Sequence, residues 1–332
     1  MTDPIRFSVI TPTHRRPESL LLMLDALSRQ TYPFDQFEVI VVGDGGLSDA
    51  LRDRTFPFRF HAVAQEKSGP AAARNRALAM AIESHLLFLD DDVIPAPTLV
   101  AEHADSHSVA SRVVIGPLLP AAIASPAPWT RWEWRTLADQ YAAMRAGKWQ
   151  PTPRQFYTGN ASVATDAVRA VGGFNVAFTR GEDVELAWRL HDRGMHFVFN
   201  ERAAAQHLAQ RSFEAWLAAA QDYGRTDVLL ERTRSGQELP RWVAREFRAR
   251  HRLTKALARV VLAQPAAWRC VPALGRAASR TADTVGRGEA AMQVCSALFT
   301  SAYWRGVATQ LGRERTIALL RSGEAAAREH AA

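Results

Sequence analysis

The chain has 332 residues, of which 47% are hydrophobic and 23% are charged, and this composition excludes a protein that is disordered or fibrous in bulk. A chain of this length can bury a sizeable core and has room for one large domain plus an appendage. The formal net charge is +7, which favours a partner that carries phosphates: a nucleotide, a nucleic acid or an anionic membrane. Genome base composition explains the abundance of Ala and Arg equally well, so the charge alone does not choose among these partners.

The two cysteines, Cys270 and Cys295, lie far apart and outside any spacing typical of metal ligands, which suits a reducing compartment. The apolar run at residues 7–10 is too short for a signal peptide. No uncharged apolar segment reaches the length that spans a membrane. Together these features predict a cytoplasmic protein.

The first part of the chain alternates between predicted strands and helices. Short apolar runs predict strands at residues 7–12, 38–42, 58–64 and 86–89. Helical spacing of apolar residues predicts one helix around residues 20–27 and another at residues 71–82. Strands separated by helices favour a parallel sheet with right-handed crossovers.

After residue 92 the pattern of apolar residues indicates strands and helices less clearly. We predict a strand at residues 113–118, a tryptophan-rich segment at residues 126–150, a helix at residues 181–193 and a strand at residues 196–200. From Ser212 onward the chain is predicted to be helical, with breaks at Pro240, Pro265 and Pro272.

Three adjacent carboxylates, at residues 90–92, follow the apolar run at residues 86–89, where a buried strand would leave its sheet. Burying them unpaired would cost several kcal/mol, so they are either solvated or gathered around a cation. The crevice beyond the carboxyl ends of strands is where open α/β sheets bind ligands. Hard carboxylate oxygens suit Mg²⁺ or Mn²⁺. A solvated acidic turn is the alternative.

Seven motifs follow one another along the chain: V-I-T-P-T-H-R-R (9–16), V-V-G-D-G-G (41–46), G-P-A-A-A-R-N (69–75), F-L-D-D-D (88–92), T-G-N-A-S (158–162), V-G-G-F (171–174) and G-E-D-V-E-L-A-W-R-L (181–190). In this order they resemble the family 2 glycosyltransferases, and the resemblance covers residues 7–207. It implies an α/β catalytic domain of the GT-A fold, with a Rossmann-like mixed sheet, at residues 1–210. Residues 211–332 would then be a helical C-terminal region.

On the donor side, the resemblance implies that the end of the first strand cradles the nucleoside, through Thr11, Pro12, Thr13 and Arg15. Asp44 resembles the carboxylate that accepts a hydrogen bond from a pyrimidine base, which favours a UDP- or dTDP-linked donor. Here the family usually shows D-D-G-S, whereas this chain has G-D-G-G, which keeps the second acidic position at Asp44 and lacks the first acid and the serine. The alternative for Asp44 is a loop carboxylate that caps its own turn.

Two further donor contacts follow from the resemblance. The small residues that begin at Gly69 permit close approach to a ligand, and Arg74 points toward the nucleotide in the family. Small residues at this density also mark tight packing of a helix on a sheet, which is the alternative.

The acidic triplet contains the D-x-D motif of the family. Asp92 would bind the divalent ion, Mg²⁺ or Mn²⁺, that bridges the two phosphates of the donor. Asp90 would contact the ribose or the water shell of the metal, with Asp91 beside it. His207 lies where many relatives supply a further metal ligand, although a lone histidine is as often a packing residue.

The acceptor side is implied by the E-D pair. Asp183 would be the general base that takes the proton from the acceptor hydroxyl, and Glu182 would help to hold the acceptor or the loop. Attack opposite the leaving phosphate inverts the anomeric configuration. The alternative is a helix N-terminus whose dipole favours acidic residues, a stabilisation of only ~0.3–1 kcal/mol.

The C-terminal region contains cations at alternating steps of four and three, which place them on one face of a helix. They are Arg241, Arg245, Arg248, Arg252, Lys255 and Arg259. A basic amphipathic helix at residues 241–261 could lie on the anionic inner face of the plasma membrane. Packing on the catalytic domain is the alternative. For the aromatic residues of segment 126–150, we weigh acceptor stacking against simple helix packing.

The sequence therefore predicts a metal-dependent inverting glycosyltransferase that uses a nucleoside-diphosphate sugar and an acceptor hydroxyl of a glycan, a lipid-linked molecule or a small molecule. A nucleotidyltransferase would need a glycine-rich loop after the first strand, and a dinucleotide-dependent oxidoreductase would need G-x-G-x-x-G there. Residues 11–17 read T-P-T-H-R-R-P and contain neither. A nucleotide-sugar-binding protein without activity remains an alternative. No nucleic acid is expected, because no recognisable nucleic-acid module is present.

Overall fold

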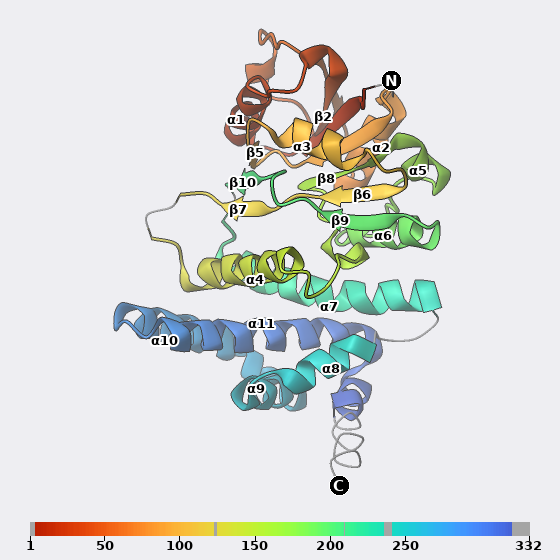
Figure 1. The fold of residues 1–332 in the computed structure, drawn as a ribbon. Coiled ribbons are helices and arrows are strands. Elements are labelled where there is room, and N and C mark those ends of the chain that lie inside the picture. The colour runs from red at the N-terminus through yellow and green to blue at the C-terminus, as the bar shows by residue number, and fades with distance from the viewer. Residues whose placement is uncertain (1–3, 123–124, 209, 236–240, 321–332) are drawn as a thin grey trace. The chain divides into compact units, whose positions relative to one another are not determined.

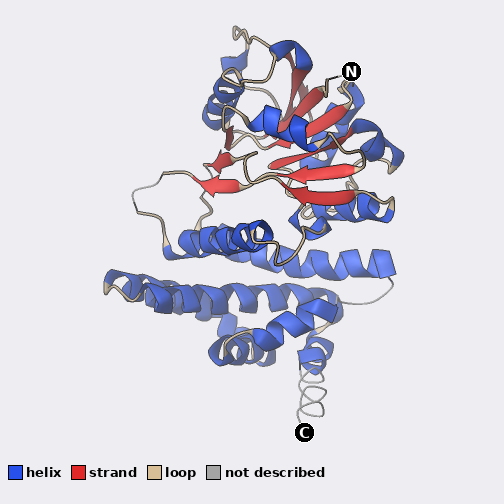
Figure 2. Cartoon of the chain, in the orientation of Figure 1, coloured by secondary structure: helices blue, strands red, loops and turns tan. Residues whose placement is uncertain are grey.

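The computed structural model describes residues 4–122, 125–208, 210–235 and 241–320. By its internal contacts the chain divides into two compact units. The first comprises the described residues of Met1–Ala122 and Thr136–Ala209, and the second those of Ile123–Arg135 and Gln210–Ala332. The strands belong to the first unit, whereas the described elements of the second are helical (Figure 2).

The elements of the first unit are shown in Figure 1. Its strands are β1 (Phe7–Thr13), β2 (Phe37–Asp44), β3 (Arg59–Gln65), β4 (His85–Leu89), β5 (Val93–Pro95), β6 (Arg112–Ile115), β7 (Leu118–Pro120), β8 (Asn160–Ala164), β9 (His196–Phe199) and β10 (Ala205–His207). Its helices are α1 (Pro17–Leu27), α2 (Pro70–Met80), α3 (Leu99–Ser106), α5 (Thr165–Ala170) and α6 (Glu182–Asp192). The helix α4 (Pro128–Arg145) begins in the second unit and ends in the first.

Seven strands form one sheet in the order β3-β2-β1-β4-β8-β6-β9. The four strands β1 to β4 run parallel, as the alternation of strands and helices predicts. The strand β8 runs antiparallel to both β4 and β6, so the complete sheet is mixed. Because parallel strands end at the same edge, the carboxyl ends of β1, β2 and β4 lie together, where ligands bind in such sheets.

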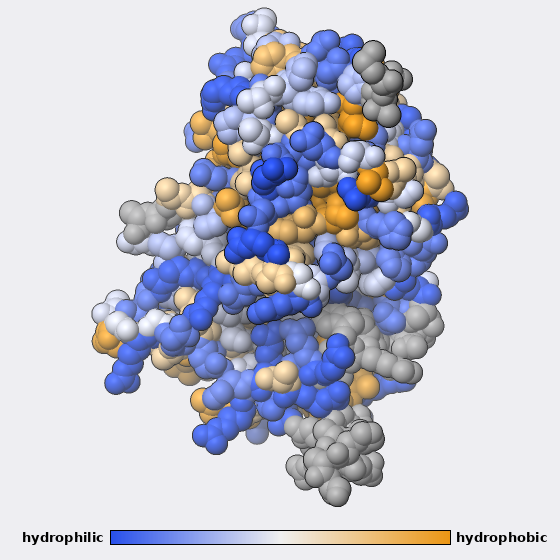
Figure 3. Space-filling view, viewed as in Figure 1, coloured by the Kyte–Doolittle hydropathy of each residue, from blue (hydrophilic) through white to orange (hydrophobic). Residues whose placement is uncertain are grey.

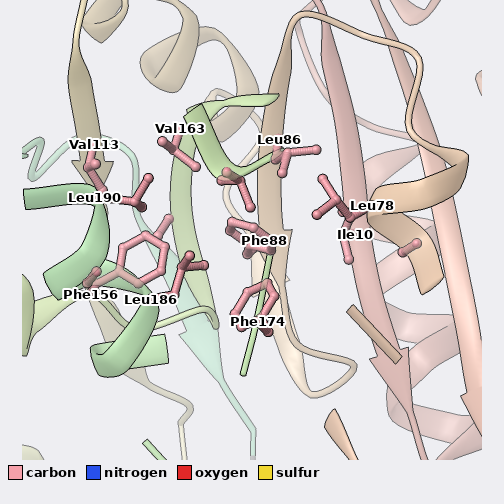
Figure 4. Close-up of a cluster of buried hydrophobic side chains, with 14 of the residues drawn as sticks. Ile10, Leu78, Leu86, Phe88, Val113, Phe156, Val163, Phe174, Leu186 and Leu190 are labelled. Carbon is pink, nitrogen blue, oxygen red and sulfur yellow. The ribbon is translucent and has the colours of Figure 1, made fainter. Parts of the chain in front are cut away.

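Buried apolar side chains cover both faces of this sheet in two clusters. Along β1 the residues alternate between the faces, with Ile10 in one cluster and Val9 in the other. On the first face, the ring of Phe88 meets those of Phe156 and Phe174 edge to face, as Figure 4 shows. Burial on both faces explains why neighbouring residues are apolar in Leu86–Leu89 of β4, in Val9 and Ile10 of β1 and in residues 39–42 of β2.

A second, three-stranded sheet has the order β5-β10-β7. The strand predicted at residues 113–118 divides here, because β6 ends at Ile115 and β7 begins at Leu118. Pro117 cannot donate a backbone hydrogen bond, and a side chain at Gly116 would meet the carbonyl oxygen of Ala203 at 2.1 Å. The chain therefore changes sheets at this Gly-Pro pair.

The second unit is built on helices α7 (Phe213–Ser235), α8 (Arg241–Ala249), α9 (Arg252–Ala263), α10 (Val271–Thr284) and α11 (Gly288–Leu311). The longest of them, α7 and α11, pack closely because each has a glycine at the contact. A Cβ atom at Gly224 would meet the carbonyl oxygen of Tyr303 at 2.1 Å, and one at Gly306 would meet that of Gln221 at 1.9 Å.

The first part of α4 differs from the predicted boundary at residue 210, because residues 125–135 belong with the helices of the second unit. The rings of Trp129 and Phe213 lie 5.2 Å apart, and those of Trp132 and Trp216 lie 5.7 Å apart. The tryptophans therefore pack helices together, as the simpler of the two interpretations predicted. Further along α4, Tyr141 stacks on Phe199 in the first unit.

The cations predicted on one helix at residues 241–261 lie on two, because α8 ends at Ala249 and α9 begins at Arg252. Apolar side chains of both helices, including Val243, Phe247 and Leu262, join a cluster with α11. The side chains of Arg241 and Trp242 lie outside those that the structure describes. The prediction of one continuous basic helix is therefore wrong. The apolar side chains of α8 and α9 are largely used in packing within the second unit.

Among the described helices, none combines the length and the apolar character that crossing a bilayer requires. On the face shown in Figure 3, hydrophobic side chains interrupt a largely hydrophilic surface.

Candidate active site

The candidate site begins where β1 and β4 leave the sheet side by side. Their parallel register pairs Ile10 with Phe88, so the residues that follow each strand emerge next to each other. The hydroxyl of Thr13 donates a hydrogen bond of 2.7 Å to Oδ2 of Asp91. Burial raises the pKa of the Asp91 carboxyl, and the hydrogen bond from Thr13 opposes that effect.

The next carboxylate, that of Asp92, has two basic neighbours. Oδ1 of Asp92 lies 3.5 Å from Nε2 of His207, and its Oδ2 contacts the guanidinium of Arg16. Burial alone would raise the pKa of Asp92, but His207 and Arg16 lower it overall. The strand β10 positions His207, because it pairs antiparallel with β5 and sets His207 opposite Val93.

Asp92 and His207, the two predicted metal ligands, therefore lie next to each other. Within the described residues, however, no three His, Cys, Asp or Glu side chains are grouped so that they could hold a metal ion by themselves. An oxygen and an imidazole nitrogen suit Mn²⁺, which commonly completes its coordination with substrate phosphates and water. The residues present therefore fit a metal that is bound together with the donor.

Arg74 of α2 connects the two halves of the site. Its Nη2 donates to Oδ1 of Asp90 and its Nη1 to Oε1 of Glu182, each at 2.8 Å. The side chain is only 5% exposed, and its guanidinium lies 5.7 Å from the centre of the Phe174 ring. The neighbouring Asn75 exchanges hydrogen bonds with the backbone of Phe174 and so fixes α2 against this segment. Residues far apart in the sequence are thereby joined through one buried cation.

Glu182 and Asp183 open α6, directly after Gly181, which has a positive φ of 74°. The carboxylate of Asp183 accepts a hydrogen bond of 2.8 Å from the backbone N–H of Val184. Burial and the neighbouring Glu182 carboxylate raise the pKa of Asp183 to about 7, and Arg74 opposes them. Asp183 is therefore poised to exchange a proton near neutral pH.

Asp44, at the end of β2, holds the loop that leads into α2. Its carboxylate accepts hydrogen bonds from the backbone N–H groups of Ser68 (2.7 Å) and Gly69 (2.9 Å) and from the side chain of Gln65 (2.9 Å). Burial alone would raise the pKa of Asp44, but these hydrogen bonds lower it overall. The donors belong to the end of β3 and the segment after it and not to the turn that Asp44 begins, and contact with a base stays a prediction.

The other residues predicted to contact the donor differ in how far they are exposed to solvent. Thr11 is fully buried and lies on the same face of β1 as Val9, so the structure does not present its side chain to a ligand. Pro12 is partly exposed, and Arg15 is exposed with a positive φ of 54°. Gly69 has a φ of 90°, and a side chain there would meet open space.

Arg16 is the site residue that the sequence did not single out. Its only signal was its place as the second arginine of the H-R-R run after β1. The surface cavities of about 570 Å³ beside β9 and about 550 Å³ beside α10 are lined by none of the predicted site residues.

Comparison with known proteins decides the family. The model of "Glycosyl transferase family 2" matches residues 8–174, which is half of the chain. The chain belongs to glycosyl transferase family 2. This family member is 31% identical over 222 residues to validoxylamine A glucosyltransferase of Streptomyces hygroscopicus subsp. jinggangensis, an alignment that covers 57% of this chain and 52% of that protein. It thus spans about half the length of that relative.

Other relatives extend the comparison. Glycosyltransferase AglE of Haloferax volcanii is 26% identical over 220 residues, covering 63% of this family 2 chain and 69% of that protein. Among solved structures, the mannosyltransferase PcManGT from Pyrobaculum calidifontis has a TM-score of 0.57 at 19% identity, and covers 98% of this chain and 82% of that one. Residues 1–349 of TarS from S. aureus have a TM-score of 0.52 at 18% identity, with 98% and 92% covered. These likenesses show the GT-A type of fold.

Proposed function

We propose that this chain transfers a sugar from a nucleoside-diphosphate donor, UDP- or dTDP-linked, to an acceptor hydroxyl with inversion of configuration. The observation that carries the proposal is the buried link through Arg74. It joins Asp90, on the predicted donor side, to Glu182, which stands beside the predicted base. Donor and acceptor would therefore meet across one connected set of charges.

Asp183 would act as the general base. As the acceptor oxygen bonds to the anomeric carbon, the carboxylate takes the hydroxyl proton, and the bond from that carbon to the diphosphate breaks. A general base works best when its pKa lies near the working pH, and Asp183 has a pKa of about 7. Glu182, held by Arg74, would position the acceptor or the loop before α6.

Asp92 and His207 would hold Mg²⁺ or Mn²⁺ together with the donor, and Asp90 and Asp91 would line the same place. A divalent cation, when bound there, would stabilise the negative charge that develops on the departing diphosphate. One fold neighbour, PcManGT, was solved with GDP-Man and Mn²⁺, and TarS was solved with UDP, which supports a nucleotide-linked donor and a divalent ion. Pro12, Thr13, Arg15, Asp44 and Gly69 would surround the nucleoside.

The acceptor class is the least constrained part of the proposal. Relatives are named for validoxylamine A, for pre-mycofactocin and for poly(ribitol-phosphate), so their names extend from small molecules to a polymer. We propose a hydroxyl acceptor within this range: a small molecule, a lipid-linked molecule or a glycan.

The direct test is release of nucleoside diphosphate from a panel of sugar donors with Mn²⁺, with and without candidate acceptors. Asp183→Asn should lower acceptor-dependent release by about 10²–10⁴-fold, the usual contribution of a general base. Asp192→Asn, an exposed acid at the other end of the same helix, is the matched control and should stay near the wild-type rate. Equal rates for Asp183→Asn and wild type with every acceptor would show that the assignment of Asp183 as the base is wrong.

We also propose peripheral contact with an anionic membrane, at the inner face of the plasma membrane, through α9. Two apolar side chains of this helix are exposed, Leu253 to 63% and Val260 to 49%, and Arg252, Lys255 and Arg259 flank them. Apolar insertion beside cations is the pattern that binds anionic lipid surfaces.

Flotation with vesicles of phosphatidylglycerol or phosphatidylcholine tests this contact. Wild type should float preferentially with the anionic vesicles, and the double variant Leu253→Ser with Val260→Ser should lose most of that preference. Val109→Ser removes a similarly exposed apolar residue, 51% exposed, from the first unit and serves as the control. Equal flotation with both lipids would remove the membrane proposal and leave the catalytic one untouched.

A further inference from the structure

Arg16 contacts two of the adjacent carboxylates of the site. It follows β1 directly and stands at the N-terminus of α1, just before Pro17. Its Nη1 lies 3.3 Å from Oδ1 of Asp91 and also contacts Oδ2 of Asp92. One guanidinium thus bridges the two adjacent carboxylates.

The two partners differ sharply in exposure. The side chains of Asp91 and Asp92 are 6% and 8% exposed, whereas that of Arg16 is 52% exposed. Two adjacent buried carboxylates repel each other, and burying them without a counter-cation would be costly. Arg16 supplies that positive charge from the solvent side.

The other arginine of the site is held quite differently. Arg74 is 5% exposed and is fixed by ion pairs to Asp90 and Glu182, so its departure would leave the buried Glu182 carboxylate without its cation. Arg16 approaches from solvent and is attached to the site by its guanidinium alone. Rotation of its long side chain is therefore enough to release both carboxylates.

We infer that Arg16 is an exchangeable counter-cation. In the free enzyme its guanidinium pairs with Asp91 and Asp92. When the divalent ion binds, the guanidinium leaves these carboxylates and binds the diphosphate of the donor. This inference rests on the proposed function, because it requires that a metal and a nucleoside diphosphate bind here. Arg16 is thus a positioning residue for the transfer.

Two physical arguments support the exchange. Arg16 contacts Oδ2 of Asp92, and His207 faces Oδ1 of the same carboxylate, so a divalent ion held by Asp92 and His207 would lie close to the guanidinium and the two cations would repel each other. A planar guanidinium also matches the geometry of a phosphate, so the displaced side chain gains a new anionic partner as soon as the donor arrives. Arg16 would therefore weaken metal binding in the free enzyme, and this opposition would fall once its guanidinium lies on the diphosphate.

The test is the affinity for Mn²⁺ in the absence of nucleotide, measured by electron paramagnetic resonance of the free ion. Arg16→Met and Arg16→Gln remove the competing charge, and each should bind Mn²⁺ about tenfold more tightly than wild type, equivalent to ~1.4 kcal/mol. Arg16→Lys keeps the charge and should stay within about twofold. Arg76→Met removes an exposed arginine from α2 and should match wild type.

Two further readouts separate exchange from a merely structural role. In EDTA, Arg16→Met should melt at a lower temperature than wild type, and Mn²⁺ should restore more of its stability. With Mn²⁺ saturating, UDP should bind Arg16→Met several-fold more weakly, because the phosphate has lost its partner.

The outcomes are distinguishable. If wild type binds Mn²⁺ and the charge-removing variants bind it no more tightly, the exchange is refuted while the proposed glycosyl transfer stands. If neither wild type nor any variant binds Mn²⁺ with or without UDP, the metal assignment itself fails, and the exchange fails with it.

Discussion

The two ends of the candidate site contain the same kind of residue in different charge environments. At the donor end, Asp92 has two basic partners, Arg16 and His207, and its pKa lies below the usual range. At the acceptor end, Arg74 pairs with Glu182, and burial together with the Glu182 carboxylate raises the pKa of Asp183 to about 7. Asp92 is buried and Asp183 is partly buried, and their charged neighbours differ in sign. The lowered pKa keeps Asp92 ionised, whereas the raised pKa allows Asp183 to take up a proton near neutral pH.

The largest expected effect comes from removing the residue that the two ends share. Arg74→Met leaves Asp90 and Glu182 without their buried partner, and breaking such a pair typically costs about 3–5 kcal/mol. We expect a correspondingly large loss of unfolding free energy in urea titrations, together with loss of transfer. The control Arg76→Met, from the exposed side of the same helix, should change stability by less than about 0.5 kcal/mol. A stable and active Arg74→Met would show that the two ends are independent.

The donor end alone is tested by Asp92→Asn. The amide cannot supply an anionic oxygen to a metal, so Mn²⁺-dependent binding of UDP should fall by at least about tenfold. Asp25→Asn, an exposed acid on α1, is the matched control. Unchanged Mn²⁺ dependence in Asp92→Asn, measured by calorimetry, would place the metal elsewhere.

The acceptor end is tested by Glu182→Gln, which removes the negative neighbour of Asp183. Because that neighbour raises the pKa of Asp183, the variant should ionise at lower pH. Activity requires the ionised base, so the acidic limb of kcat/KM against pH should move to lower pH. A limb that stays in place would mean that Glu182 does not influence the base.

The smallest effect is expected at Thr13, whose hydroxyl bonds to Asp91. Thr13→Val keeps the shape of the side chain and removes one buried hydrogen bond, so we expect a loss of about 1–3 kcal/mol in unfolding free energy. Thr98→Val, outside the site and without a side-chain cap at α3, should cost less. Equal costs would argue against a special role for Thr13 at the donor end.

Motif order predicted much of this arrangement, because each motif lies where a strand ends or a helix begins. The sequence predicts Asp92 and Asp183 as two halves of one site, and that assignment stays a prediction. The link through Arg74 to Glu182 could not be predicted, since no spacing reveals which distant carboxylate a helix residue will meet. Arg16 was overlooked for the same reason.

Alternation of strands and helices predicted β1 to β4 but not the antiparallel β8, which depends on tertiary pairing. Thr11 was predicted as a donor contact, but the alternation along β1 directs its side chain into the core, where it is fully buried. The first turns of α4 were assigned to the catalytic domain, and their tryptophans pack instead with helices that come much later in the chain.

The central claim is that Asp183 ionises near neutral pH because burial and the neighbouring Glu182 carboxylate raise its pKa more than Arg74 lowers it. Carbon-13 NMR titration of aspartate-labelled protein, with Asp183→Asn to assign the signal, measures this directly. The account predicts a midpoint near pH 7 for Asp183. A midpoint close to the ordinary aspartate value of about 4 would contradict it.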